Sequence, residues 1–153
     1  METLKEAKQS LRDGWEKGIA CPCCGQWVKR YKRKMNSGMA RLMIAINRVK
    51  GDKNGCFHMV QAMMDMGLNA ATMEYSKLKH WGLIEEANGK LDDGNSNGFW
   101  RITPRGREFV MGLRIPRYIY LYDGKLLEVS EGETIDIRTA LGDKFNYEEL
   151  MSQ

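Results

Sequence analysis

Two segments, LKHWGLI at residues 78–84 and FWRITPRG at residues 99–106, decide the fold that the sequence predicts. The first leads from residues of helical spacing to Gly82, and glycine suits a helix end because it readily adopts the left-handed backbone conformation. An apolar pair of residues then begins a short strand. The second segment is a strand followed by Pro104, which suits the first turn of a helix because the amide it lacks would be unpaired there. With the polar residues 87–98 as a loop, the pattern predicts helix, strand, loop, strand and helix.

Two further helices are expected before this unit. Asn36 and Ser37 are good N-cap residues, and the apolar residues behind them follow one face of a helix: Met39, Leu42, Met43, Ile46 and Val49. The glycine-containing segment 51–55 ends that helix. The second helix ends at Gly67 and is expected to place four apolar residues on one side: Phe57, Val60, Met63 and Met64. Asn69 then caps a third helix over 69–81, whose inward residues are expected to be Ala71, Tyr75 and Leu78.

This order of elements resembles the winged helix-turn-helix domain of MarR-like and PadR-like regulators. Residues 78–84 resemble the Leu-x-x-x-Gly-Leu-Ile block of those families, and residues 99–106 resemble their strand followed by Leu-Thr-x-x-Gly. The resemblance covers 36–112 and implies an α+β fold in which helix 69–81 enters the major groove of DNA. The contacts it implies come from Asn69, Thr72, Ser76 and Lys77, with Met73 and His80 also facing outward. An unrelated α+β domain is the alternative.

Some features depart from this family pattern. The expected recognition helix carries Glu74 and contains no arginine. The expected wing, residues 88–98, holds Asp92 and Asp93 against a single Lys90, and carboxylates near phosphate oppose binding. The wing is therefore a poor candidate for DNA contact.

Extensions flank the central domain, so the chain divides into residues 1–35, 36–117 and 118–153. An amphipathic helix is expected from Thr3 to about Lys17, because Thr3 and Glu6 form a capping box. The last segment begins with two strand-like runs joined by Asp123-Gly124, a pair that favours a β-hairpin. Its acidic end, 134–153, is expected to hold two short helices or turns.

The net charge of +4 is unevenly distributed: residues 1–55 carry +8, residues 56–117 carry +1 and residues 118–153 carry −5. Positive residues surround Tyr31 and follow Trp27, and the basic block comprises Lys29, Arg30, Lys32, Arg33, Lys34 and Arg41. Basic residues interleaved with aromatic ones can hold a nucleic-acid backbone while rings stack or pack. The alternative is a solvated strand whose aromatic side chains face the core.

Three of the four cysteines lie within CPCCG at residues 21–25, which is awkward for a disulfide framework and familiar for a metal site. The segment contains Cys-Pro-x-Cys-Gly and resembles the zinc knuckle of ribbon-type domains. A tetrahedral site needs four ligands, and the set expected for a structural Zn²⁺ is Cys21, Cys24, Cys56 and His58. Cys23 is the alternative to Cys24, and reduced cysteines that pack as small apolar groups are the alternative to a metal site.

Together these features predict a non-enzymatic protein that binds double-stranded DNA, in the manner of a phage or bacterial transcriptional regulator. Only two histidines are present, and no glycine-rich phosphate loop or nucleophile motif accompanies them. The alternative is a protein-interaction module in which a winged helix docks on a host or viral protein complex. A homodimer is compatible with either function. The sequence has no secretion signal and no apolar run long enough to span a membrane, so a cytoplasmic protein is expected. Residues 21–43 are also similar to blocks in small phage-encoded proteins of unassigned function, which implies a source and no activity.

Overall fold

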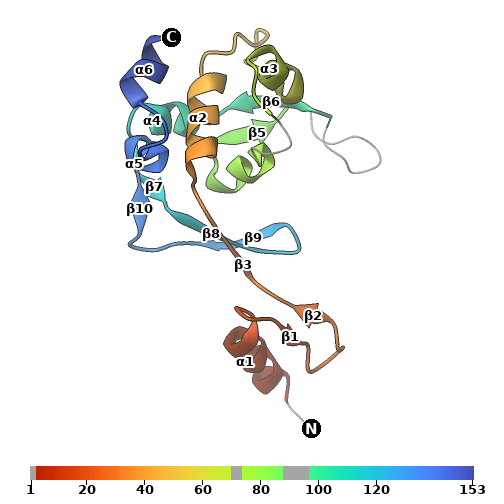
Figure 1. Cartoon of the computed structure of the whole chain (residues 1–153). Coiled ribbons are helices and arrows are strands. Elements are labelled where there is room, and N and C mark those ends of the chain that lie inside the picture. Colours follow the sequence, from red (N-terminus) through yellow and green to blue (C-terminus); the bar gives the residue numbers. More distant parts are fainter. Residues whose placement is uncertain (1–2, 70–73, 88–96) are drawn as a thin grey trace.

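The computed structural model describes residues 3–69, 74–87 and 97–153. It is an α+β fold, as the sequence predicts. Figure 1 shows a larger body that contains most of the helices and, at the other end, a small N-terminal unit; strand β3 runs between them. Among the described helices, none is long and apolar enough to cross a membrane.

The larger body is built from short helices around a small antiparallel sheet. The helices are α2 (Ser37–Ile46), α3 (Met59–Asp65), the 3₁₀ helix η1 (Tyr75–Trp81) and α4 (Pro104–Val110). The strands are β4 (Phe57–His58), β5 (Ile84–Glu86) and β6 (Phe99–Ile102), which lie in the order β4-β6-β5. The sequence predicted strands at β5 and β6 and a helix through β4. Phe57 instead pairs with Trp100, α3 begins only at Met59, and Met64 is 64% exposed rather than packed.

Side-chain caps begin the helices at the expected places. The Asn36 side chain accepts a hydrogen bond from the Met39 amide at 2.9 Å, and the Thr103 hydroxyl accepts one from the Gly106 amide at 3.0 Å. Gly82 ends η1 with φ 77°, the left-handed conformation predicted for it. These positions were identified from sequence because capping and glycine conformation depend on local chemistry.

The two segments that predicted the fold contact one another directly. The Thr103 hydroxyl donates to the Gly82 carbonyl at 2.6 Å, and the Arg105 side chain donates to the Trp81 carbonyl at 2.9 Å. Gly106 lies so close to the turn after η1 that a Cβ at this position would be 2.2 Å from the Leu83 carbonyl oxygen. The start of α4 is therefore hydrogen-bonded to the end of η1 and packed against it.

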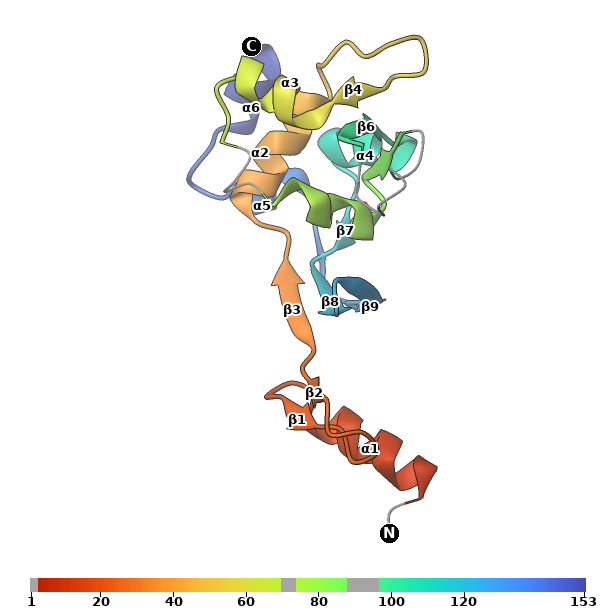
Figure 2. The ribbon, with the colours of Figure 1, turned by 90° about the vertical axis from the view of Figure 1, so that its right-hand side faces the viewer.

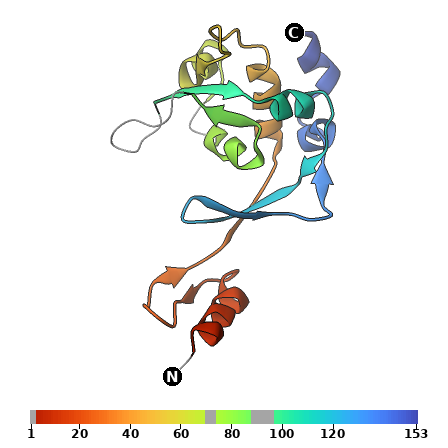
Figure 3. The same cartoon turned by 180° about the vertical axis from the view of Figure 1, so that it is seen from behind.

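A second antiparallel sheet pairs a strand that precedes the larger body with a hairpin that follows α4. Its strands are β3 (Tyr31–Lys34), β8 (Tyr118–Tyr122) and β9 (Lys125–Val129), with β8 in the centre. The β8–β9 hairpin turns at Asp123 and Gly124, both with positive φ, as their sequence predicts. Figure 3 shows the hairpin from behind, with β3 beside β8.

The C-terminal segment is part of the same core. Strand β10 (Thr134–Ile135) pairs with β7 (Ile115–Pro116), and two short helices follow, α5 (Ile137–Leu141) and α6 (Tyr147–Ser152). Helix α5 packs against α2. One continuous cluster holds buried residues from 36–117 and from 118–153, among them Met39, Leu42, Leu78, Trp100, Phe109, Ile119, Leu121, Ile135, Ile137 and Leu141.

The N-terminal unit consists of α1 (Leu4–Gly14), β1 (Ile19–Ala20) and β2 (Trp27–Val28). Thr3 caps α1 by accepting a hydrogen bond from the Glu6 amide at 3.1 Å, as predicted. Strands β1 and β2 form a hairpin that encloses the cysteine turn. In Figure 2 this unit lies below the β3-β8-β9 sheet and away from the helices of the larger body.

Candidate nucleic-acid interface

Strand β3 carries most of the basic block along one edge of its sheet. Its four side chains, Tyr31, Lys32, Arg33 and Lys34, are all exposed. Among the described residues, no carboxylate lies within ion-pair distance of Lys32, Arg33 or Lys34. Three cations on consecutive residues without an acidic partner repel one another and favour an anionic ligand.

The register of β3 against β8 places lysines beside tyrosines. Lys32 is opposite Tyr120 and Lys34 is opposite Tyr118, and directly opposed residues share one face of a sheet. The Lys32 ammonium lies 4.0 Å from the centre of the Tyr118 ring, and the Arg117 guanidinium lies 5.5 Å from the same ring. We name these five residues, Lys32, Lys34, Arg117, Tyr118 and Tyr120, the tyrosine–lysine face.

This face combines the two groups that a nucleic-acid backbone and its bases require. The ammonium and guanidinium groups can pair with phosphates, and the half-buried rings of Tyr118 and Tyr120 offer flat apolar surface. The rings also keep the cations in place through cation–π contacts. The face therefore offers both charged and flat apolar groups on one surface.

Arg30 differs from the rest of the basic block because its charge is already paired. Its guanidinium forms ion pairs with Glu16 of the N-terminal unit and Glu128 of β9, and its side chain is only 14% exposed. It also lies 5.0 Å from the Trp15 ring and 4.1 Å from the Tyr120 ring. Arg30 thus joins the N-terminal unit to the sheet and is a poor candidate for phosphate contact.

The remaining basic residues of the predicted block lie at two different locations, near Tyr31 and on α2. Lys29 and Arg33 flank the Tyr31 ring at 5.3 and 6.0 Å. Tyr31 and Arg33 alternate with Lys32 and Lys34 along β3, so they belong to the opposite face of the sheet. Arg41 lies on α2, where its guanidinium is 5.0 Å from the Phe145 ring. The structure therefore places Lys32, Arg33 and Lys34 on one edge strand but divides them between its two faces, and it places Arg41 elsewhere.

Of the helix predicted over 69–81, the structure shows the part from Glu74 onward. Within it, Tyr75–Trp81 form the 3₁₀ helix η1. Tyr75, Leu78 and Trp81 recur every three residues and turn toward the core, which matches the three-residue period of a 3₁₀ helix. The Trp81 indole N–H donates to the Pro116 carbonyl at 2.8 Å. Because the buried residues have this spacing, core packing supports the tighter helix.

The predicted base-contacting residues are only partly on the surface of this segment. Asn69 and Ser76 are exposed, Lys77 is half-buried, and Thr72 lies outside the described residues. Partial burial and the nearby charges of Lys79 and Lys77 lower the pKa of His80. Protonation of His80 is therefore less favourable than that of an ordinary histidine.

The four predicted zinc ligands do not meet in the structure. Cys21 and Cys24 lie in the turn between β1 and β2 of the N-terminal unit, whereas Cys56 and His58 lie at β4 in the larger body. Cys56 is 9% exposed, and its neighbour Phe57 is fixed by pairing with Trp100. Within residues 3–69, 74–87 and 97–153, no group of three or more potential metal ligands is assembled.

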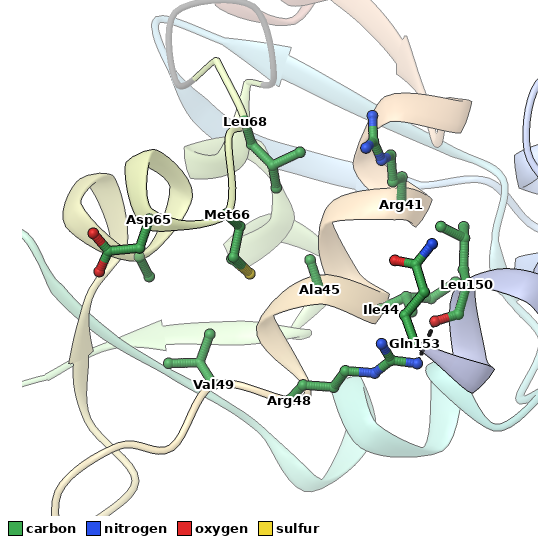
Figure 4. Close-up of a pocket in the computed structure, with 11 residues that line it drawn as sticks. Arg41, Ile44, Ala45, Arg48, Val49, Asp65, Met66, Leu68, Leu150 and Gln153 are labelled. Carbon is green, nitrogen blue, oxygen red and sulfur yellow. Dashed lines mark hydrogen bonds between the residues drawn. The ribbon is translucent and has the colours of Figure 1, made fainter.

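A cavity of about 600 Å³ lies between α2, α3 and the C-terminal helix. Figure 4 shows apolar side chains such as Ile44, Met66 and Leu68 on its walls and Arg41 and Arg48 at its margin. The Arg48 guanidinium donates to the Leu150 backbone carbonyl, which attaches α6 to α2. The cavity therefore lies where α6 approaches α2 and α3.

Sequence reasoning missed the contribution of Tyr118 and Tyr120 to the basic site. It expected Trp27 and Tyr31 as the aromatic partners, because these residues are adjacent to the lysines in the chain. The regular alternation of tyrosine in 118–122 was a usable signal of a shared sheet face. The pairing of β8 with β3, nearly ninety residues away in the chain, is a tertiary feature that periodicity does not specify.

Comparison with known proteins found no match: no family model matches the chain, and no curated protein or solved structure shows significant similarity to it.

Proposed function

We propose that this protein binds double-stranded DNA, with a winged helix-turn-helix in residues 36–117 and phosphate contacts from the tyrosine–lysine face. The observation that carries the proposal is the run Lys32-Arg33-Lys34, exposed along the edge of the β3-β8-β9 sheet and free of carboxylate partners among the described residues. DNA carries a dense array of phosphates, and binding to such cations releases its condensed counterions. The proposed role is that of a phage or bacterial transcriptional regulator.

The arrangement of 36–117 supports the winged-helix part of the proposal. The described elements follow the order α2, α3, η1, β5, β6 and α4, and β5 and β6 form an antiparallel hairpin around residues 87–98. Strand β4 extends this hairpin to three strands. The hydrogen bonds from Thr103 and Arg105 to the end of η1 hold the helix beside the hairpin, and this leaves Ser76 on its exposed side.

A salt titration tests the proposal. Binding of a fluorescent duplex is measured by anisotropy between 50 and 300 mM salt for the wild type and for the triple variant Lys32→Ala, Arg33→Ala, Lys34→Ala. Each lost phosphate contact lowers the slope of log K against log salt by about 0.9, so the triple variant should lose up to about 3 from its slope.

The matched control removes the same charge elsewhere. The control variant is Lys5→Ala, Lys17→Ala, Lys144→Ala. These three lysines are exposed and lie outside the tyrosine–lysine face, and their removal gives the control the same net charge as the first triple variant. The control should retain most of the wild-type slope. Absence of binding at 50 mM salt, or equal slopes in both triple variants, would refute the proposed interface.

A second candidate function is protein interaction through β9. This strand is the other edge of the sheet, and its apolar side chains Leu126, Leu127 and Val129 are 42%, 43% and 36% exposed. An open edge with apolar side chains can accept a strand from another protein. Nuclease-resistant capture of one protein in a fixed ratio, abolished by Leu126→Lys, would favour this function over DNA binding.

A further inference from the structure

Two aromatic residues near the start of β3 remain largely open to solvent. Trp27 is 61% exposed and Tyr31 is 44% exposed. Among the described residues, only Phe99 on β6, at 42%, presents a comparable aromatic surface. Trp27 and Tyr31 are therefore rings that the fold itself does not cover.

Both rings line one shallow hollow at the end of the β3-β8-β9 sheet. The hollow has a volume of about 140 Å³, and we call it the aromatic hollow; it is lined by Gln26, Trp27, Lys29, Tyr31, Tyr122 and Asp123. Tyr122 ends β8 and Asp123 begins the hairpin turn, so the hollow lies where β3 begins and β8 ends. It has room for a single planar ring system.

The structure holds both rings in place. A Cβ on Gly18 would be 2.1 Å from the Cζ2 atom of Trp27 and 2.7 Å from its Cε2 atom, so the indole lies directly against the Gly18 backbone. Such a close approach requires glycine. Tyr31 is held by β3, where it pairs with Leu121. Rings that are already positioned lose little conformational entropy when a ligand binds.

The charges beside the aromatic hollow favour an anionic ligand. Lys29 and Arg33 lie 5.3 and 6.0 Å from the centre of the Tyr31 ring, and neither forms an ion pair within residues 3–69, 74–87 and 97–153. Aromatic rings also attract cations, but these two charges oppose a cationic ligand. A nucleotide fits this pattern, because its base is a planar ring system and its phosphate is an anion.

The remaining polar groups fit the edge of a base. Asp123 and Gln26 line the same hollow, and a carboxylate accepts hydrogen bonds from the amino group of a base such as cytosine. The base must be unpaired, because pairing and stacking in a duplex cover its edge and both of its faces. Single strands leave these faces open, and exposed aromatic side chains bind them by stacking.

We propose that the aromatic hollow binds one unpaired nucleotide of a single strand, whose base stacks against Trp27 and Tyr31. Its phosphate pairs with Lys29 and Arg33, and Asp123 accepts a hydrogen bond from the amino group of the base. The site is separate from the tyrosine–lysine face. It therefore goes beyond duplex binding and does not depend on it.

The experiment measures binding of short oligocytidine strands to the full chain. Anisotropy of labelled DNA and RNA strands gives the affinity, and unlabelled strands should quench tryptophan fluorescence by stacking on Trp27. Binding of either strand supports the proposal. Trp27→Leu and Tyr31→Leu should each weaken binding roughly 5- to 100-fold, which is the contribution of stacking one base, and Trp27→Leu should lose the quenching. A blunt duplex of the same length should not quench this fluorescence.

Phe99→Leu is the matched control, because it removes an equally exposed aromatic ring far from the hollow and should leave the affinity unchanged. Oligocytidine should bind more tightly than oligothymidine, whose base has no amino group. Asp123→Gly should remove this preference, since glycine accepts the positive φ of this turn position. Circular dichroism verifies that each variant keeps the fold.

Three results would overturn the proposal: no binding of either single strand by the wild type, an equal loss of affinity in Phe99→Leu and Trp27→Leu, or equal quenching by the blunt duplex. Failure of duplex binding in the salt titration, with single-strand binding intact, would overturn the proposed function and leave this site standing.

Discussion

Gly106 allows a sharp test of how the two sequence segments meet. It lies in the first turn of α4, where an added Cβ would be 2.2 Å from the Leu83 carbonyl oxygen and 2.8 Å from the Ile102 side chain. Carbon and oxygen atoms in van der Waals contact are usually more than 3 Å apart, so Gly106→Ala requires a shift of about 1 Å. The Leu83 carbonyl cannot move freely, because it also accepts the Thr103 amide at 3.0 Å.

The expected cost follows from these contacts. Overpacking of this kind destabilises by about 1–3 kcal/mol, and weakening the Thr103 hydrogen bond adds about 1 kcal/mol. The greater helix propensity of alanine offsets about 1 kcal/mol. We therefore expect Gly106→Ala to lower the free energy of unfolding by about 1–3 kcal/mol and the melting temperature by roughly 2–12 °C in a chain of this size.

Gly38 is the matched control, because it also lies in the first turn of a helix, α2, and is nearly unobstructed. A Cβ there would be 3.4 Å from the Asn36 side-chain oxygen, an ordinary van der Waals distance. Gly38→Ala should leave stability unchanged or raise it by up to about 1 kcal/mol. Urea unfolding followed by tryptophan fluorescence measures both variants. Equal midpoints for Gly106→Ala and wild type would show that α4 does not pack against the end of η1.

Three further predictions concern single contacts. Trp81→Phe removes the indole donor from the Pro116 carbonyl and should lower the free energy of unfolding by about 1–3 kcal/mol, as measured by urea denaturation; an unchanged midpoint would contradict it. Hydrogen bonds from the Thr139 amide and hydroxyl, together with Arg114 and Arg138, lower the pKa of Asp136. The charged carboxylate therefore stabilises the fold at pH values above 3.8, the pKa in the unfolded state. This contribution is lost as the pH falls through the lower pKa of the folded state. Asp136→Asn, which keeps an N-cap side chain, should therefore be less stable than wild type at pH 7, with the difference shrinking toward pH 2; a pH-independent difference would count against this. The His80 imidazole should titrate below 6.5 in an NMR pH series, because burial and the neighbouring lysines disfavour its protonation; a midpoint at or above 6.5 would show that this environment is different.

Local chemistry accounts for the elements that the sequence predicted well. Thr3, Asn36 and Thr103 cap helices because their side chains accept backbone N–H groups a few residues away. Asp123 and Gly124 form the hairpin turn because both adopt positive φ. None of these features depends on residues far away in the sequence.

Elements set by distant contacts were predicted poorly. Strands β4 and β10 have two residues each, too few for a period, and they exist because β6 and β7 lie beside them. Met64 has the right spacing for a packed helix face, yet α3 buries Met59 and Met63 and leaves Met64 exposed. The candidate zinc ligands are separated in the same way: His58 is in β4 and Cys56 directly precedes it, and β4 lies at the opposite end of the molecule from the β1–β2 hairpin that encloses Cys21.

The sequence by itself determined the caps, the turn residues, the helix–strand–strand–helix order of the central part and the concentration of positive charge before Met35, because each depends on residues close together in the chain. Only the tertiary structure decided which of those charges stay available. Pairing of β3 with β8 placed Lys32 and Lys34 beside two tyrosines, while Arg30 was neutralised by Glu16 and Glu128. The physical reason is that sheet register and ion pairing join residues far apart in sequence, and no local preference specifies the partner.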